Sequence, residues 1–200
     1  LYHRTKNNMQ VISSMLKMQS GYSDNELVHN AFRDIINKIK SMSLVHEKLY
    51  QADDLSKINL KDYIENLIRL LRRSYSQQAA NVSLNFELED VFVLIDSAIP
   101  LALVLNELIS NVFKHAFPES GKGELSIRLY QEENGTINIH LADNGVGLPV
   151  DFDLAKVKTM GLPTMFSLID YQLKGEVTYL VENGLKWHMK FWDDLQKTRV

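Results

Sequence analysis

Apolar and polar positions along the first fifty residues have the spacing of two amphipathic helices. In the stretch 1–20, the apolar residues Met9, Ile12 and Leu16 recur at steps of three and four. Turn-forming residues fill positions 21–25, and a second helix is predicted from about Glu26 to Tyr50. Its apolar seam consists of Phe32, Ile35, Ile39, Met42, His46 and Leu49. Because this seam alternates steps of three and four, the sequence predicts a coiled-coil-like helical hairpin.

The predicted hairpin has two apolar stripes and no other element nearby to cover them. A second copy of the chain would cover the stripes in a four-helix bundle. Alternatively, the domain that follows in the sequence covers them within one chain. We favour the first interpretation, which predicts a homodimer that charged substitutions at Ile35 and Ile39 would disrupt.

After a polar stretch at 52–59, which is typical of a linker, the pattern changes to a mixture of helix and strand. Helices are predicted at 60–80, 101–117 and about 162–173 from their apolar faces. Alternating apolar residues predict strands at 82–88, 91–95, about 125–129, 136–142, 176–181 and 185–191. Two pairs of strands are joined by Asn-Gly, a hairpin signal. The fold class is therefore α+β: a helical hairpin, followed by a sheet with helices on one face, an α/β sandwich.

Composition excludes several classes of protein. The 200 residues carry a formal net charge of −3, which gives no indication of nucleic acid as a partner. The chain has no cysteine, so disulfides and thiolate metal sites are excluded, and its six histidines are scattered along the sequence. No uninterrupted apolar run approaches the ~20 residues of a membrane span, and no signal peptide is visible. We expect a cytoplasmic location, without membrane contact in this segment.

The predicted helix 101–117 has unusual polar residues beside its buried face. Glu107 and Asn111 are four residues apart and therefore share a side of the helix, and Lys114 and His115 follow within about a turn. An acid beside an amide, with a lysine nearby, suits a magnesium-bound triphosphate. Taken alone, the same residues also fit the solvated face of a core helix.

Two glycine-containing segments favour the nucleotide site over the solvated helix face. The strand 136–142 leads into Asp143-Asn-Gly-Val-Gly147, where Gly145 and Gly147 allow close approach of the backbone to a flat ligand. At the strand end, Asp143 has an acceptor for an adenine amino group. Further on, Gly161 and Leu162 open a helix whose first N–H groups are available to phosphate.

These three segments resemble the nucleotide-binding domain shared by gyrase, Hsp90, histidine kinases and MutL (GHKL), which has the Bergerat fold. Helix 101–117 resembles its N box, and residues 143–147 and 159–162 resemble its two glycine boxes. The resemblance implies binding of ATP and Mg²⁺. It implies that Asn111 holds the metal and that Glu107 orients or deprotonates the nucleophile. Contact with phosphates is implied for Lys114, His115, Gly161 and Leu162, contact with adenine for Asp143, Gly145 and Gly147, and a lid for 150–158.

The beginning of the chain resembles the phosphoacceptor helix of one subfamily of sensor histidine kinases. The stretch His3-Arg-Thr-Lys-Asn-Asn8 matches its His-Arg-x-Lys-Asn-Asn pattern. The resemblance implies ATP-dependent phosphorylation of His3, then transfer to an aspartate of a response-regulator receiver domain. It also implies three parts: a dimerisation and phosphotransfer hairpin at 1–51, a linker at 52–59 and an ATP-binding domain at 60–200. We expect an upstream sensor domain that this segment does not include.

Some residues depart from the family pattern. The commoner histidine-kinase type has an acid after the histidine and a proline five residues on, where this chain has Arg4 and Asn8. Leu185 and Trp187 occupy a region in which the family often has a threonine near the adenine. Two other functions stay open: a docking or phosphorelay dimer that does not bind ATP, and a GHKL ATPase that clamps a partner.

Overall fold

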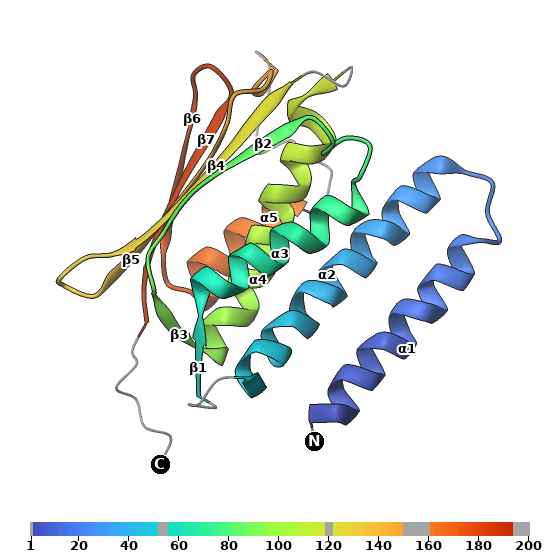
Figure 1. Ribbon diagram of the computed structural model, residues 1–200, viewed down its shortest axis with the longest axis horizontal. Helices are drawn as coiled ribbons and strands as arrows, with labels where there is room; N and C mark the ends of the chain where they lie inside the picture. Colours follow the sequence, from blue (N-terminus) through green and yellow to red (C-terminus); the bar gives the residue numbers. More distant parts are fainter. Residues whose placement is uncertain (1, 52–55, 119–121, 150–160, 194–200) are drawn as a thin grey trace.

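The computed structural model describes residues 2–51, 56–118, 122–149 and 161–193. Two long antiparallel helices come first, α1 (Tyr2–Ser20) and α2 (Glu26–Gln51), and α2 lies between α1 and the rest of the molecule (Figure 1). The remaining elements form a twisted sheet that is covered by helices on one face (Figure 1). The predicted α+β class, with a helical hairpin before an α/β sandwich, is confirmed.

The sheet has five strands in the order β2-β4-β5-β7-β6. These are β2 (Val82–Leu88), β4 (Gly123–Gln131), β5 (Thr136–Asp143), β6 (Glu176–Val181) and β7 (Leu185–Trp192). Only the β2–β4 pair is parallel among these neighbours. Both predicted Asn-Gly turns are present, and Asn183 and Gly184 have φ values of 51° and 112°. The loop between the paired residues Val181 and Leu185 has three residues, and positive φ at the last two allows this tight β6–β7 connection.

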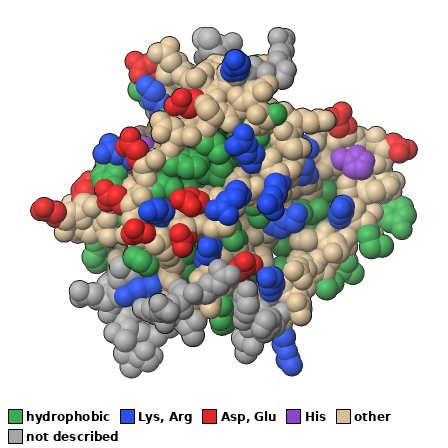
Figure 2. Space-filling model, in the orientation of Figure 1, with side chains coloured by type: hydrophobic (Ala, Val, Ile, Leu, Met, Phe, Trp, Pro, Cys, Tyr) green, Lys and Arg blue, Asp and Glu red, His purple; other side chains and the backbone are tan. Residues whose placement is uncertain are grey.

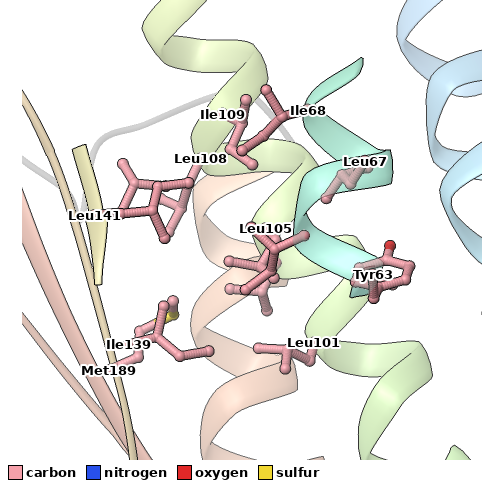
Figure 3. Packing of buried hydrophobic residues seen from close by; sticks show 14 of the residues in the cluster. Tyr63, Leu67, Ile68, Leu101, Leu105, Leu108, Ile109, Ile139, Leu141 and Met189 are labelled. Carbon is pink, nitrogen blue, oxygen red and sulfur yellow. The ribbon is translucent and has the colours of Figure 1, made fainter. Parts of the chain in front are cut away.

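Helix α4 (Ile95–Asn111) lies at the centre of the core, between the sheet and α3 (Leu60–Ser74). In Figure 3, Leu101 and Leu108 of α4 extend toward the sheet residues Ile139, Leu141 and Met189, while Tyr63 and Leu67 of α3 lie on the other side. Alternation along β5 and helical spacing along α4 bring these apolar faces together. Helix α5 (Gly161–Ser167) and the π-helix η4 (Leu168–Gln172) complete the helical layer.

Helix α4 begins earlier than the sequence predicted. It starts at Ile95, directly after the short strand β3 (Phe92–Leu94), so Pro100 lies inside the helix and not at its beginning. Proline removes one backbone hydrogen bond there, a local cost that the burial of Leu101 and Leu105 offsets. Beyond Asn111 the chain continues as the π-helix η1 (Val112–Ala116). The last three residues of the expected linker at 52–59 are not a linker in the structure. They form the short strand β1 (Lys57–Asn59), which pairs with β3.

Within the described part of the chain, Ile95–Ala116 is the one helical segment long and apolar enough to cross a membrane. Its apolar residues are interrupted by Asn106, Glu107 and Asn111. In the fold, 61% of an 18-residue apolar stretch of this segment is buried inside the protein. The length and composition of the segment therefore fit its place as the core helix.

The hairpin packs on the following domain through α2. A row of α2 residues at steps of four is buried against α3 and α4: Asn37, Ser41, Val45 and Leu49. Tyr63 of α3 donates a hydrogen bond from its hydroxyl to the carbonyl oxygen of Ser41 at 3.3 Å. One side of α2, including Leu49 of the predicted seam, is thus covered within a single chain, which was the alternative interpretation.

Candidate functional site

Three segments that are far apart in the sequence meet at the C-terminal end of α4. The Asn111 Nδ2 donates to Glu107 Oε1 at 3.4 Å. Gly161, at the start of α5, lies so close to Glu107 that a Cβ would overlap its carboxylate. On the loop after β5, a Cβ on Gly145 would overlap the carbonyl oxygen of Ala116 in η1. At Gly145 the added atom would meet backbone, so glycine is required there, whereas at Gly161 it would meet the movable end of the Glu107 side chain. The predicted N box thus contacts both predicted glycine boxes.

Asp143 is the last residue of β5 and only 6% exposed. Its Oδ1 accepts hydrogen bonds from the backbone N–H groups of Gly145, at 2.9 Å, and Leu185, at 3.4 Å. Burial raises the pKa of the Asp143 carboxyl, and these two hydrogen bonds oppose that shift. Two backbone donors thus fix the orientation of the carboxylate, and a carboxylate retains further acceptor capacity for a ligand amine.

The β6–β7 turn forms another wall of this site. A Cβ on Gly184 would overlap the backbone carbonyl of Asp143. Gly147 has a φ of 69°, and a Cβ there would lie 3.0 Å from Val181 Cγ1 and 3.3 Å from the carbonyl oxygen of Gly184. From the sequence, Asn183-Gly184 was predicted only as a turn. Strand order, which the sequence does not reveal directly, places that turn beside Asp143.

Lys114 and His115 lie in η1, one turn beyond Asn111. Lys114 Nζ forms an ion pair with Asp34 Oδ2 of α2 at 2.7 Å. Desolvation and the charge of Lys114 lower the pKa of the His115 imidazole, while Asp34 and Glu107 oppose that shift. His115 is therefore expected to be neutral at pH 7. Single π turns inside helices are frequent at functional sites.

Helix α2 contributes residues that the sequence analysis missed. Lys38 Nζ lies 2.9 Å from Glu107 Oε2, and Tyr75 donates from its hydroxyl to Asp34 Oδ1 at 2.8 Å. Asp34 and Lys38 are four residues apart, so they share one face of α2. That spacing was visible in the sequence, but only the packing of α2 against α4 shows which charges they meet.

The remaining predicted site residues are less completely placed. Leu162 is buried in the first turn of α5, but the predicted lid at 150–158, with Thr159 and Met160, lies outside the described residues. The backbone of His3 is in the first turn of α1, and its side chain also lies outside what the structure describes. Lys6, one turn later, pairs with Glu47 of α2 at 3.2 Å. The His3 end of the hairpin is thus far along α2 from Asp34.

Two protein-family models match this chain. Residues 1–75 match a family described as histidine kinase. Residues 96–194 match a family described as histidine kinase-, DNA gyrase B-, and HSP90-like ATPase. The second match contains the N-box helix and both glycine segments, and the first contains the hairpin and α3.

Curated relatives match over most of the chain. A protein named sensor histidine kinase PdtaS, from Mycobacterium tuberculosis, is 28% identical over 179 residues, which cover 88% of this chain and 35% of the relative. Blue-light-activated histidine kinase 2 of Erythrobacter litoralis is 23% identical over 163 residues, covering 80% and 46%. The chain therefore spans between about a third and a half of the length of these relatives.

A solved structure has the same fold. The histidine kinase domain of a blue-light activated histidine kinase from Erythrobacter litoralis aligns with a TM-score of 0.70 at 19% identity, over 95% of this chain and 88% of that one. At this identity the likeness concerns the fold, including both the helical hairpin and the sheet domain.

Proposed function

We propose that this chain is the kinase core of a sensor protein. Its family matches support a two-component histidine kinase with a GHKL ATPase domain. It uses ATP and Mg²⁺ to phosphorylate its own His3 and passes the phosphoryl group to an aspartate of a response-regulator receiver domain. Residues 1–51 form the phosphotransfer hairpin and residues 60–200 the ATP-binding domain. The full protein has an upstream sensor domain, and this part of it works in the cytoplasm.

The observation that carries the proposal is the convergence of a buried, oriented Asp143 with two glycine segments at the polar end of α4. Asp143 accepts a hydrogen bond from the adenine amino group, and the backbone at Gly145 and Gly147 lines the pocket for the ring. Lys114, His115, Gly161 and Leu162 contact the phosphates. These groups bind and orient the nucleotide, which is most of what phosphoryl transfer requires of a protein.

The residues present fit a magnesium ion held largely by the nucleotide. Among the described residues, no group of three His, Cys, Asp or Glu side chains forms a metal cage. Asn111, beside Glu107, offers an amide oxygen, and Mg²⁺ usually takes few protein ligands plus phosphate oxygens and water. When bound, the ion neutralises phosphate charge. Asn111 would hold it, and Glu107 would orient the His3 imidazole or take its proton.

In the proposed reaction, an unprotonated ring nitrogen of His3 attacks the γ-phosphorus of ATP, and the bond to the β–γ bridging oxygen breaks to release ADP. Incubation with γ-labelled ATP tests this directly. We expect label on the protein that is labile to acid and stable to base, as a phosphoramidate is. Nucleotide turnover without a labelled protein would instead favour the partner-clamping ATPase, and absence of nucleotide binding would favour the docking dimer.

Substitutions in the N box should separate chemistry from adenine recognition. Asn111→Ala is expected to slow Mg²⁺-dependent labelling about 100-fold or more, because a ligand that places charge in the transition state is lost. Glu107→Gln should slow labelling by roughly 100-fold with less than a threefold change in nucleotide affinity. Labelling rates and calorimetric affinities measure the two effects. If both variants were labelled at the wild-type rate, the polar residues of α4 would have no role in the reaction and would simply face solvent.

The uncovered side of the hairpin supports a homodimer. Val11, Ile12, Met15 and Met18 of α1 are 48–66% exposed, and Ile35 of α2 is 46% exposed. Figure 2 shows hydrophobic side chains along this outer edge of the molecule. These residues recur at helical spacing, so a second hairpin would bury them as one stripe in a four-helix bundle.

We therefore expect light scattering to give the mass of a dimer at micromolar concentration. Met15→Glu combined with Ile35→Glu should give a monomer, because burying two carboxylates in an apolar seam is unfavourable. Tyr171→Glu is the matched control, since Tyr171 is 76% exposed on η4, outside the hairpin. A monomeric wild-type protein would contradict the prediction.

A further inference from the structure

Strand β6 is an outer strand of the sheet, and it exposes apolar side chains on both of its faces. The consecutive residues Tyr179, Leu180 and Val181 are 42%, 55% and 47% exposed. We propose that β6 is a self-pairing edge, along which two copies of this chain join their sheets by antiparallel pairing. This contact is separate from the hairpin dimer and does not depend on the kinase activity.

The opposite edge of the same sheet is protected against such pairing. On β2 the exposed positions are the polar residues Ser83, Asn85 and Glu87, and the apolar residues between them pack toward the core. Strand β6 lacks the usual protection, because it contains no lysine or proline and its residues pair with β7 one for one, without a bulge. An unprotected apolar edge is a template for another strand.

The backbone groups available at this edge alternate along β6. The N–H of Leu185 on β7 points to Asp143 of β5 and not to β6, so Leu185 and the facing Val181 form a non-hydrogen-bonded pair. Every second residue, namely Val177, Tyr179 and Val181, therefore directs its N–H and C=O groups to the open side of β6. An added strand would meet donors and acceptors at the spacing of an antiparallel ladder.

The other elements leave room for a strand beside β6. A hollow of about 580 Å³ lies between η4 and the first half of β6, with Tyr171 and Val177 among its lining residues. Figure 1 shows β6 and α1 on opposite sides of the molecule. The β6 contact and the hairpin contact can therefore form at the same time.

Charge and side-chain type select one register for the self-pairing. Residues directly opposite each other in antiparallel strands share a face, so the two-fold axis must pass through one residue. An axis through Tyr179 would set Glu176 opposite Glu182 of the second copy, and like charges in that position are destabilising. An axis one residue earlier would set Glu176 opposite Leu180. An axis through Leu180 sets Leu180 against itself and Tyr179 against Val181, an aromatic–β-branched pair that sheets favour.

The contact is small and therefore weak on its own. A pair of short strands buries far less than the ~1,600 Å² of a standard protein interface. We expect a dissociation constant on the order of 100 µM or weaker, above the micromolar range in which the hairpin contact is measured. Each hairpin dimer carries a β6 edge on both copies, so pairing along these edges would join dimers into larger assemblies.

Cysteine cross-linking tests the register. The chain has no cysteine, so Leu180→Cys supplies a single thiol per copy. Across the proposed axis the two thiols face each other, and oxidation by dissolved oxygen with a copper catalyst should give a covalent dimer. Thr178→Cys is the matched control on the same face of β6, because its two thiols would be about 14 Å apart along the strands. We expect Leu180→Cys to cross-link about tenfold faster or more, and equal rates would overturn the proposal.

Two lysine substitutions test the contact without a covalent bond. In the Met15→Glu/Ile35→Glu protein, designed to lack the hairpin contact, sedimentation should show a monomer at about 10 µM and a growing fraction of dimer toward about 1 mM. Leu180→Lys should abolish that growth, because two ammonium groups would meet at the axis. Thr178→Lys should preserve or increase it, because residue 178 faces Glu182 of the second copy. Equal loss from both substitutions would overturn the register, and absence of any association would assign the edge to a strand of another protein and refute self-pairing.

Discussion

Replacement of His3 by glutamine is expected to reduce phosphorylation from γ-labelled ATP to background while nucleotide affinity stays unchanged. A neutral imidazole nitrogen is a usable nucleophile near pH 7, whereas the glutamine amide is not. His3 lies in the first turn of α1, and the nucleotide residues lie on α4, β5 and α5. The substitution therefore removes the acceptor without touching the pocket. Labelling and calorimetry on the same preparation measure both effects.

His29→Gln is the matched control for this experiment. His29 is exposed near the start of α2, and its Nδ1 shares a hydrogen bond with Ser20 Oγ at 2.7 Å. The other histidines are worse candidates: His46 is half-buried on α2, and the rings of His140 and His188 stack at 4.0 Å on the sheet. Acid-labile phosphate on the His3→Gln protein would move the acceptor elsewhere, with His29 examined first.

Local patterns in the sequence were sufficient for most elements of this fold. The face of α3 formed by Ile64, Leu67, Ile68 and Leu71 is buried as its helical spacing predicted. The Asn-Gly pairs gave the correct hairpin turns, in which Gly135, Asn183 and Gly184 have positive φ. These features depend on neighbours in the chain, which a sequence displays directly.

Features that depend on tertiary packing were predicted less well. Pro100 suggested a helix start, yet the core formed with the sheet extends α4 back to Ile95. The predicted seam of α2 missed the row that contains Asn37 and Ser41, because polar side chains gave no sign of burial. Such positions are recognised only when the elements that cover them are known.

In the candidate site, too, local sequence features were predicted better than contacts that depend on tertiary packing. The residue types at Glu107, Asn111, Asp143 and Gly161 predicted a nucleotide site, and the structure brings these residues to one end of α4. The ion pairs of Glu107 and Lys114 with α2 were not predictable, since charges on α2 have many possible partners until the packing of the hairpin is fixed. A sequence thus indicates which chemistry is present more readily than which neighbours restrain it.

Substitution of Asp143 by asparagine is expected to weaken ATP binding roughly ten- to a hundredfold while the fold persists. The carboxylate of Asp143 is acceptor-only when ionised, and its Oδ1 is fixed by the N–H groups of Gly145 and Leu185. An asparagine keeps one acceptor for those groups, so its amino group would be turned toward the adenine amine. Two donors then face each other in a buried site, and the unmade hydrogen bond costs about 1–3 kcal/mol.

Calorimetry measures the affinity, and circular dichroism reports whether the variant is folded. Asp170→Asn is the control, because Asp170 is an exposed carboxylate on η4 and undergoes the same change in charge and shape. If Asp143→Asn bound ATP like the wild type with an intact spectrum, the adenine contact would have to be reassigned. Equal weakening by Asp170→Asn would instead show that the loss is not specific to Asp143. A loss confined to Asp143→Asn is the expected result, because only that carboxylate ends a strand at the glycine loop.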